Sequence, residues 1–251
     1  MGSESDKGRE AIVEEEEEEI VCLESFFIND DYQLTKFTFG SHVLELYCLQ
    51  SASTDFDLTG QLVWPGAMLM NGYLSENADI LQGCSVLELG SGVVRDVMYC
   101  NIITPCITGV LCSKFCRKVI FTDHNDEVLK ILKKNIDLHG HSSGPKPSAE
   151  LEAAKLEWGN SDQLGQILKK HNDGFDLILG ADIYILIVEQ LLRIRGQGNC
   201  KFILAYVSRA RQMDSAILRE GAQHGMLMNE VSGTRCTVGN LEGVIYEITL
   251  Q

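Results

Sequence analysis

The sequence predicts an α/β protein with a mostly parallel β-sheet and helices on both faces. From residue 86 onward, apolar runs typical of buried strands alternate with runs typical of helices. Such alternation indicates parallel strands, because each helix carries the chain back along the sheet before the next strand begins. The chain has 251 residues, of which 45% are hydrophobic, so it can bury the core of one large domain.

The segment before this alternating region predicts a β-hairpin and then a helix. Residues 36–50 hold two short β-like runs around Gly40 and Ser41. A helix should begin at Pro65, since proline suits the first helical turn, with an apolar face formed by Ala67, Met68, Met70 and Leu74. The alternating region predicts strands near 85–90, 118–123, 151–158, 174–182, 200–208, 225–232 and 243–250, and helices over 107–116, 125–140 and 211–224.

Acidic residues are concentrated at the N-terminus. Residues 1–31 carry twelve acidic and two basic side chains, in a chain whose net charge is −15. We predict a disordered acidic tail over 1–31 and one folded domain over 32–251, because a block of like charges repels itself and has nothing to bury. No basic stripe is present outside this tail, so we do not expect nucleic acid binding.

Neither a membrane span nor a metal site is expected. No apolar run approaches the roughly 18 to 20 residues of a spanning helix, and the first residues lack the apolar segment of a signal peptide. The nine cysteines include no pair spaced as Cys-x-x-Cys, so we expect reduced thiols, mostly in the core. We therefore expect a soluble cytoplasmic protein that does not bind membranes, with the nucleus as the alternative location.

Candidate ligand-binding residues follow the predicted strands. In an open α/β sheet the ligand binds beyond the carboxyl ends of the central strands. Glycines there let a ligand approach the backbone, an acid can accept hydrogen bonds from ribose hydroxyls, and an indole offers a flat face to an adenine ring. In chain order, these positions hold Glu88, Gly90, Gly92, Asp123, Trp158, Asp182 and Tyr184.

Six motifs in this order resemble the seven-stranded S-adenosylmethionine-dependent methyltransferases, and more narrowly the family 16 lysine methyltransferase-like proteins. They are VWPGA, VLELGSG, TDHN, LEWG, FDLILGADIYI and FILAYVSR, and the resemblance covers roughly residues 34 to 250. It implies a Rossmann-like sheet of seven strands whose last strand is antiparallel to the others.

The resemblance also implies how the cofactor is held. Glu88 and the segment from Gly90 to Gly92 match the loop around the methionine end of S-adenosylmethionine. Asp123 matches the acid that binds the ribose, and an ordinary loop aspartate is the structural alternative. Trp158 matches an aromatic residue near the adenine, and a simple packing tryptophan is the alternative.

Two further motifs match the walls of the cofactor pocket and of the substrate channel. Trp64 helps wall the pocket in the family pattern, although a hydrophobic lead-in to the helix would equally explain it, and Ala181 belongs to the cofactor-binding set. Asp182 and Tyr184 border the substrate channel in that pattern; a capping aspartate and a half-buried tyrosine are the alternatives. We assign Asp182 the hypothetical role of orienting the substrate amine once it has lost its proton.

The glycine-rich loop departs from the family pattern. That pattern would run GSGVGITGV, whereas VRDVMYCNIITPC, residues 94–106, here separates GSGV from ITGV. In dinucleotide-binding folds the acid lies about 20 residues after the glycine motif. Asp123 lies 31 positions after Gly92, and removing thirteen residues leaves 18. We therefore predict an insertion over 94–106, after which Thr104 and Pro105 cap and restart the helix.

These observations support two functional hypotheses. The first is an active methyltransferase that modifies a protein substrate, on lysine or alternatively on histidine or another side chain. The second is a non-catalytic binding protein whose cofactor loop is blocked by the insertion, because Val94 replaces a glycine and the inserted residues are rich in apolar side chains. A nicotinamide-dependent oxidoreductase is a distant third, since no site for a hydride acceptor is recognisable.

Overall fold

The computed structural model describes most of the predicted domain. The predicted acidic tail, Trp64, Tyr184 and all of the predicted insertion except Cys106 lie outside the described residues. The described residues are 32–49, 65–92, 106–140, 149–183, 187–195, 199–208, 211–238 and 240–251.

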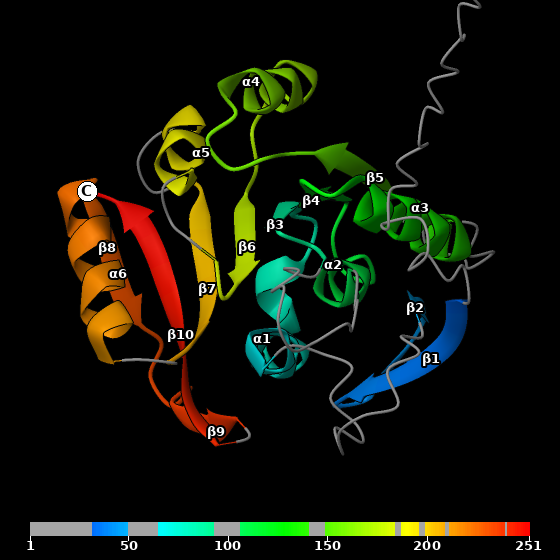
Figure 1. Cartoon of the computed structure of the whole chain (residues 1–251), viewed down its shortest axis with the longest axis horizontal. Coiled ribbons are helices and arrows are strands. Elements are labelled where there is room, and N and C mark those ends of the chain that lie inside the picture. The colour runs from blue at the N-terminus through cyan, green and yellow to red at the C-terminus, as the bar shows by residue number, and fades with distance from the viewer. Residues whose placement is uncertain are drawn as a thin grey trace, which may run out of the picture. The chain divides into compact units, whose positions relative to one another are not determined.

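A central β-sheet forms the middle layer of the molecule (Figure 1). Its strand order is β5-β4-β3-β6-β7-β10-β8, and the short strand β9 pairs with β10 beside this path. The five strands β5, β4, β3, β6 and β7 are parallel to one another. Strand β10 runs antiparallel to its neighbours β7 and β8, as predicted for the last strand. The strands are β3 (Ser85–Leu89), β4 (Lys118–Asp123), β5 (Glu150–Lys155), β6 (Leu177–Ala181), β7 (Lys201–Val207), β8 (Met226–Glu230), β9 (Cys236–Val238) and β10 (Leu241–Leu250).

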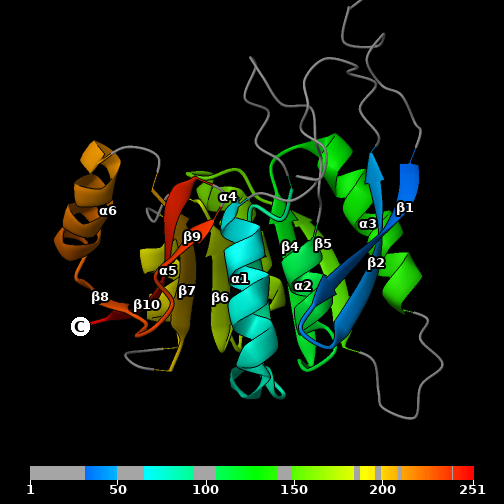
Figure 2. The same cartoon turned by 90° about the horizontal axis from the view of Figure 1, so that it is seen from below.

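Helices cover both faces of the sheet, which confirms the predicted fold class (Figure 2). Successive strand residues point to opposite faces: Val86 packs in the core on the side of α1 and α2, while Leu87 packs on the side of α4 and α5. The helices are α1 (Pro65–Glu76), followed by the short 3-10 helix η2 (Ala78–Leu81), and then α2 (Ile107–Cys112), α3 (Asp126–Gly140), α4 (Ser161–Lys170), α5 (Val188–Ile194) and α6 (Arg211–Gln223).

Some details differ from the sequence-based expectations. Met68 was placed on the buried face of α1 but is 43% exposed, because Gly66, Met70, Asn71 and Leu74 form that face instead. Helix α2 ends at Cys112 rather than at residue 116. Helices α4 and α5 and strand β9 were not predicted.

The N-terminal hairpin is a separate two-stranded sheet, β1 (Tyr32–Phe39) and β2 (His42–Leu49). Its turn contains Gly40 at a φ of +55°, a conformation that favours glycine. Side chains of α3 pair with the outer edge of β2: Asn135 exchanges two hydrogen bonds with the Tyr47 backbone, at 2.7 and 3.1 Å, and His139 Nε2 lies 2.7 Å from the Glu45 carbonyl oxygen. These bonds attach the hairpin to the domain.

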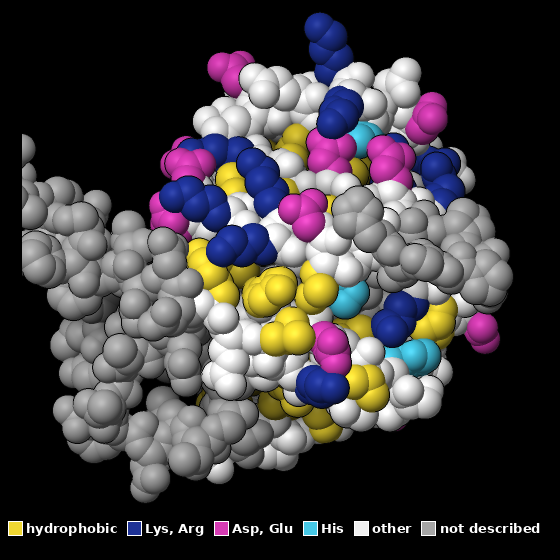
Figure 3. All heavy atoms as spheres, turned by 90° about the vertical axis from the view of Figure 1, so that its right-hand side faces the viewer, with side chains coloured by type: hydrophobic (Ala, Val, Ile, Leu, Met, Phe, Trp, Pro, Cys, Tyr) yellow, Lys and Arg dark blue, Asp and Glu magenta, His cyan; other side chains and the backbone are white. Residues whose placement is uncertain are grey.

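Figure 3 looks onto the side of the molecule that carries the hairpin and α3, where apolar side chains gather between lysines and arginines. None of the described helices is long and apolar enough to cross a membrane. The described cysteines are free thiols, and most are buried, as expected: Cys48, Cys106, Cys112, Cys116 and Cys200.

Candidate active site

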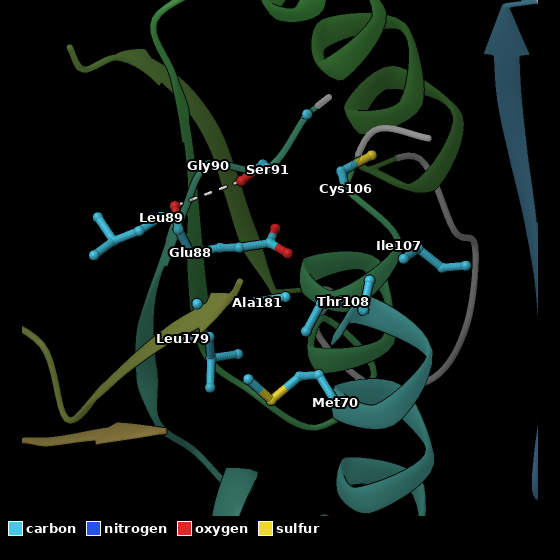
Figure 4. A pocket seen from close by; sticks show the side chains of 13 residues that line it. Met70, Glu88, Leu89, Gly90, Ser91, Cys106, Ile107, Thr108, Leu179 and Ala181 are labelled. Carbon is cyan, nitrogen blue, oxygen red and sulfur yellow. Dashed lines mark hydrogen bonds between the residues drawn. The ribbon is translucent and has the colours of Figure 1, made fainter. Parts of the chain in front are cut away.

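A pocket opens at the carboxyl ends of β3 and β6, where the sequence predicted a ligand (Figure 4). Four segments contribute to its wall: the end of β3 with the glycine turn, the start of α2, the end of β6 and one face of α1. The lining residues are Ala67, Met70, Glu88, Leu89, Gly90, Ser91, Gly92, Cys106, Ile107, Thr108, Leu179, Gly180 and Ala181.

The glycine turn is held against the end of β4. Ser91 donates its backbone N–H to the Thr122 carbonyl oxygen at 2.8 Å, and its hydroxyl accepts the Thr122 N–H at 3.1 Å. Gly90 adopts a φ of +67°. A Cβ atom on Gly92 would lie 2.0 Å from Val128 Cγ1, so only glycine fits there. The turn therefore brings bare backbone to the pocket, as a closely bound ligand requires.

The start of α2 returns to this turn. The Cys106 N–H donates to the Ser91 carbonyl oxygen at 2.6 Å, and Cys106 adopts a φ of 57° as the N-cap of α2. The prediction that Thr104 caps the helix is therefore wrong. The helix begins at Ile107, and its N-cap Cys106 makes no side-chain hydrogen bond to it. The glycine turn that follows β3 and the start of α2 thus meet directly at the pocket.

Glu88 is the most unusual charged group in the pocket. Glu88 is 6% exposed, and among the residues that the structure describes its Oε2 atom has no hydrogen-bond partner. Burial raises the pKa of Glu88 to about 7; hydrogen bonding from Ser91, Gly109 and Thr108 opposes this rise, and the negative charge of Asp123 adds to it. A buried carboxylate with one oxygen still open to a donor is suited to bind a cationic group, such as the ammonium of a methionine-like ligand.

Asp123 is also buried, but its carboxylate has partners. Oδ2 accepts the Gly92 N–H at 3.0 Å, and Oδ1 accepts the Asn125 N–H at 2.9 Å. Burial raises the pKa of Asp123, and these backbone bonds offset only part of the rise. The predicted ribose-binding acid therefore lies against the glycine turn, although it is not among the residues that line the pocket.

Trp158 lies on the other side of the same turn. Its indole is 39% exposed, and a Cβ atom on Gly90 would be 3.4 Å from Trp158 Cζ2. An exposed aromatic surface is thus available next to the glycines, as the predicted adenine contact requires.

Asp182 fastens the end of β6 to its neighbours. Its Oδ1 atom accepts the Val207 N–H at 2.8 Å, and its backbone N–H donates to the Ala205 carbonyl oxygen at 2.9 Å. Oδ2 lies so close to Gly66 of α1 that a Cβ atom there would be 2.7 Å away. Ala181 lines the pocket, whereas Asp182 stands just outside the lining. Its proposed role toward a substrate therefore remains a prediction.

The sequence-based candidates did not include all the residues of the pocket. Thr108 and Ile107 belong to the ITGV segment, which marks the start of α2 and could have indicated them. Met70 was predicted only as a core residue, because the expected site was restricted to the strand ends. Within the described part of the chain, no cluster of histidine, cysteine and acidic residues could hold a metal ion.

Comparison with known proteins agrees with this geometry. Residues 48–219 match the family described as lysine methyltransferase. The mouse (Mus musculus) protein N-lysine methyltransferase METTL21A is 28% identical over 179 residues, which are 70% of this chain and 67% of the mouse protein. The protein-lysine N-methyltransferase EFM3 of Chaetomium thermophilum is 31% identical over 145 residues, which are 56% of this chain and 37% of that protein.

A solved structure of the human methyltransferase 10 domain containing protein is also similar, with a TM-score of 0.47, 12% identity and coverage of 73% of this chain and 82% of that chain. This chain spans about two thirds of the mouse relative and less than half of the Chaetomium relative. The family match covers more than half of the 251 residues and includes both the glycine turn and the end of β6. The chain belongs to the lysine methyltransferase family.

Proposed function

We propose that this chain uses S-adenosylmethionine to methylate the side-chain amine of a lysine in a protein substrate. The observation that carries the proposal is the buried Glu88 carboxylate, whose Oε2 atom has no donor in the described part of the chain and lies beside a turn that requires glycine. The family match and the protein-lysine methyltransferases among the relatives support the same reaction.

The residues of the pocket fit this cofactor. Glu88 would bind its ammonium group, and the backbone of Gly90 and Gly92 would contact its methionine end. Asp123 would accept hydrogen bonds from the ribose, and Trp158 would contact the adenine. When bound, the cofactor supplies an electrophilic methyl group on a sulfonium. The chain must then place the acceptor nitrogen in line with that group and exclude water.

The substrate amine must also lose a proton before it can react. Lysine has a reference pKa near 10.4, and a desolvated channel would lower it. We assign Asp182 to orient the neutral amine, since its carboxylate is fixed by the Val207 N–H at the rim of the pocket. Tyr184 and Trp64 are assigned to the channel and to the pocket wall from the family pattern alone. We also propose that the protein works in the cytoplasm, with the nucleus as the alternative location.

Methylation of lysine can be tested directly in cell lysate. The full chain is incubated with lysate and S-adenosylmethionine labelled in its methyl group, and labelled proteins are hydrolysed to amino acids. We expect the label in methyl-lysine, and a Glu88→Gln variant should transfer far less. Label in methyl-histidine would overturn the assignment of lysine. No observation of the described residues favours the non-catalytic alternative. It would replace the proposal if no label is transferred and the purified chain does not bind S-adenosylhomocysteine.

A further inference from the structure

Asn71 is a fully buried polar residue in the middle of α1, directly behind the pocket. Its exposed fraction is 0%, and its Nδ2 atom donates to the Ala67 carbonyl oxygen at 2.7 Å and to Thr108 Oγ1 at 3.0 Å. Its Oδ1 atom has no hydrogen-bond partner within the described ranges. A buried amide with one unsatisfied atom is costly, and a leucine of similar size would avoid that cost.

Thr108 connects this asparagine to the pocket. It is 4% exposed, belongs to the first turn of α2 and lines the pocket beside Glu88. Because its oxygen accepts the Asn71 N–H, its own hydroxyl proton must point elsewhere. The Glu88 carboxylate is a nearby acceptor, since its Oε2 atom has no hydrogen-bond partner among the described residues and the Thr108 hydroxyl lowers the pKa of Glu88. Figure 4 shows the Glu88 side chain reaching from β3 toward the start of α2.

We infer that Asn71 is a positioning residue for cofactor binding: it orients the Thr108 hydroxyl so that this hydroxyl donates to Glu88 and favours its charged form. The inference rests on the proposed function, because the charged carboxylate is the form that attracts an ammonium group. It adds to that function a residue of α1 that does not itself line the pocket.

In the described part of the chain, few other titratable groups face Glu88. Asp123 of β4 opposes its ionisation through its negative charge. The thiols of Cys106, the N-cap of α2, and of Cys112, the last residue of α2, remain protonated, since burial raises the pKa of each well above its ordinary value. The parts of α1 and β6 that line the pocket are uncharged. The polar chain from Asn71 through Thr108 is therefore one of the few influences that stabilise the carboxylate, together with Ser91 and Gly109.

A merely structural role for Asn71, as a link between α1 and α2, predicts something different. In that case Asn71→Leu would alter the free energy of unfolding but leave the titration of Glu88 unchanged. Under the inference, Asn71→Leu raises the titration midpoint of Glu88 by about half a pH unit, since the lost donor is one step removed from the carboxylate.

The experiment measures that midpoint in the full chain without ligand, from the carboxyl carbon resonance of Glu88, and then the affinity for S-adenosylhomocysteine by calorimetry from pH 6 to 9. Asn71→Leu should weaken binding by about threefold at pH 6 and leave it unchanged at pH 9, because Glu88 is charged in both proteins at high pH. Thr108→Val should reproduce this pattern. Thr108→Ser, which keeps the hydroxyl, should behave like the unmodified chain.

The double variant Asn71→Leu with Thr108→Val decides whether the two residues act in series. If Asn71 acts through Thr108, the double variant matches Thr108→Val alone, whereas independent effects would add. An unchanged Glu88 midpoint in a folded Asn71→Leu protein would overturn the inference. The proposed function fails separately, if the unmodified chain binds no S-adenosylhomocysteine at any pH in this range.

Discussion

Two carboxylates at the rim of the sheet differ in their partners. Glu88, near the end of β3, is buried, its Oε2 atom has no hydrogen-bond partner among the residues described, and its pKa rises to about 7. Asp182, which follows β6, has its carboxylate fixed by the Val207 N–H and packed against Gly66. The Glu88 side chain therefore has an oxygen open to a ligand, whereas the Asp182 side chain connects the end of β6 with β7 and α1. A motif match alone does not reveal this difference.

The largest effect expected from this comparison concerns catalysis by Asp182. Asp182→Asn keeps an oxygen that can accept the Val207 N–H but removes the charge. If the carboxylate orients the substrate amine, methyl transfer should fall by about 1,000-fold, within the range of general acid-base residues. Affinity for S-adenosylhomocysteine should stay the same. Steady-state transfer and calorimetry measure the two, and transfer within a few fold of the original would reduce Asp182 to its structural role.

Glu88 should produce the next largest effect, on stability as a function of pH. Its pKa in the folded protein, about 7, lies above its ordinary value of 4.5, so the folded state retains a proton that the unfolded state has released. The retained proton stabilises the folded state relative to the unfolded state. This contribution to the free energy of unfolding is fully present below pH 4.5 and is lost as the pH rises through 7. Between pH 5 and 8 the free energy of unfolding should therefore fall by about 3 kcal/mol through this group.

Glu88→Gln is the matched control, because the amide has almost the same shape and does not titrate. Denaturant unfolding of both proteins at pH 5 and pH 8 gives the comparison. Between pH 5 and pH 8, the decrease in the free energy of unfolding should be smaller in the variant by about 3 kcal/mol. If both proteins show the same decrease, Glu88 is already charged at neutral pH.

The sequence predicted the layout of the fold well, for a physical reason. Parallel strands are buried on both faces, so they read as apolar runs such as VLELG and DLILGA, and the reversed last strand followed from the family pattern. Helices α4 and α5 were missed because they are short, at 10 and 7 residues, and adjoin polar turns. Short helices leave few repeats of the apolar period to recognise.

Residues of the candidate site could be predicted from the sequence in two cases: where the backbone conformation requires glycine, and where the residue belongs to a recognisable motif. Gly90 and Gly92 could be assigned because a close turn requires glycine. The isolation of the Glu88 oxygen depends on how α1 and α2 pack around it, and this packing is tertiary information. The bond from Cys106 to Ser91 likewise joins positions that are far apart in the sequence.

A smaller effect is expected from the glycine that packs against Asp182. Gly66→Ala places a Cβ atom 2.7 Å from Asp182 Oδ2, so helix or carboxylate must shift, at a cost of about 2 kcal/mol in the free energy of unfolding. Gly72→Ala is the control in the same helix, where no atom lies within 4 Å, and it should instead stabilise by about 0.5 to 1 kcal/mol. Chemical denaturation measures both. Equal effects of the two substitutions would mean that Asp182 does not pack tightly on α1.

The smallest effect should come from deletion of residues 94–105, which leaves Cys106 in place. Joining Val93 to Cys106 would make the existing bond from the Cys106 N–H to the Ser91 carbonyl oxygen a bond between residues three apart, as in an ordinary β-turn. The free energy of unfolding should change by less than about 1 kcal/mol, since loop length contributes weakly.

Thermal unfolding with and without S-adenosylhomocysteine distinguishes what the deletion does to the site. A ligand that binds the folded state raises the melting temperature by mass action. Similar increases in both proteins would show that residues 94–105 leave the pocket beside Glu88 accessible. An increase only after deletion would show that they block it, and the chain would then be a binding protein with an unsatisfied carboxylate. Loss of the increase on deletion would instead place residues 94–105 in the cofactor site itself.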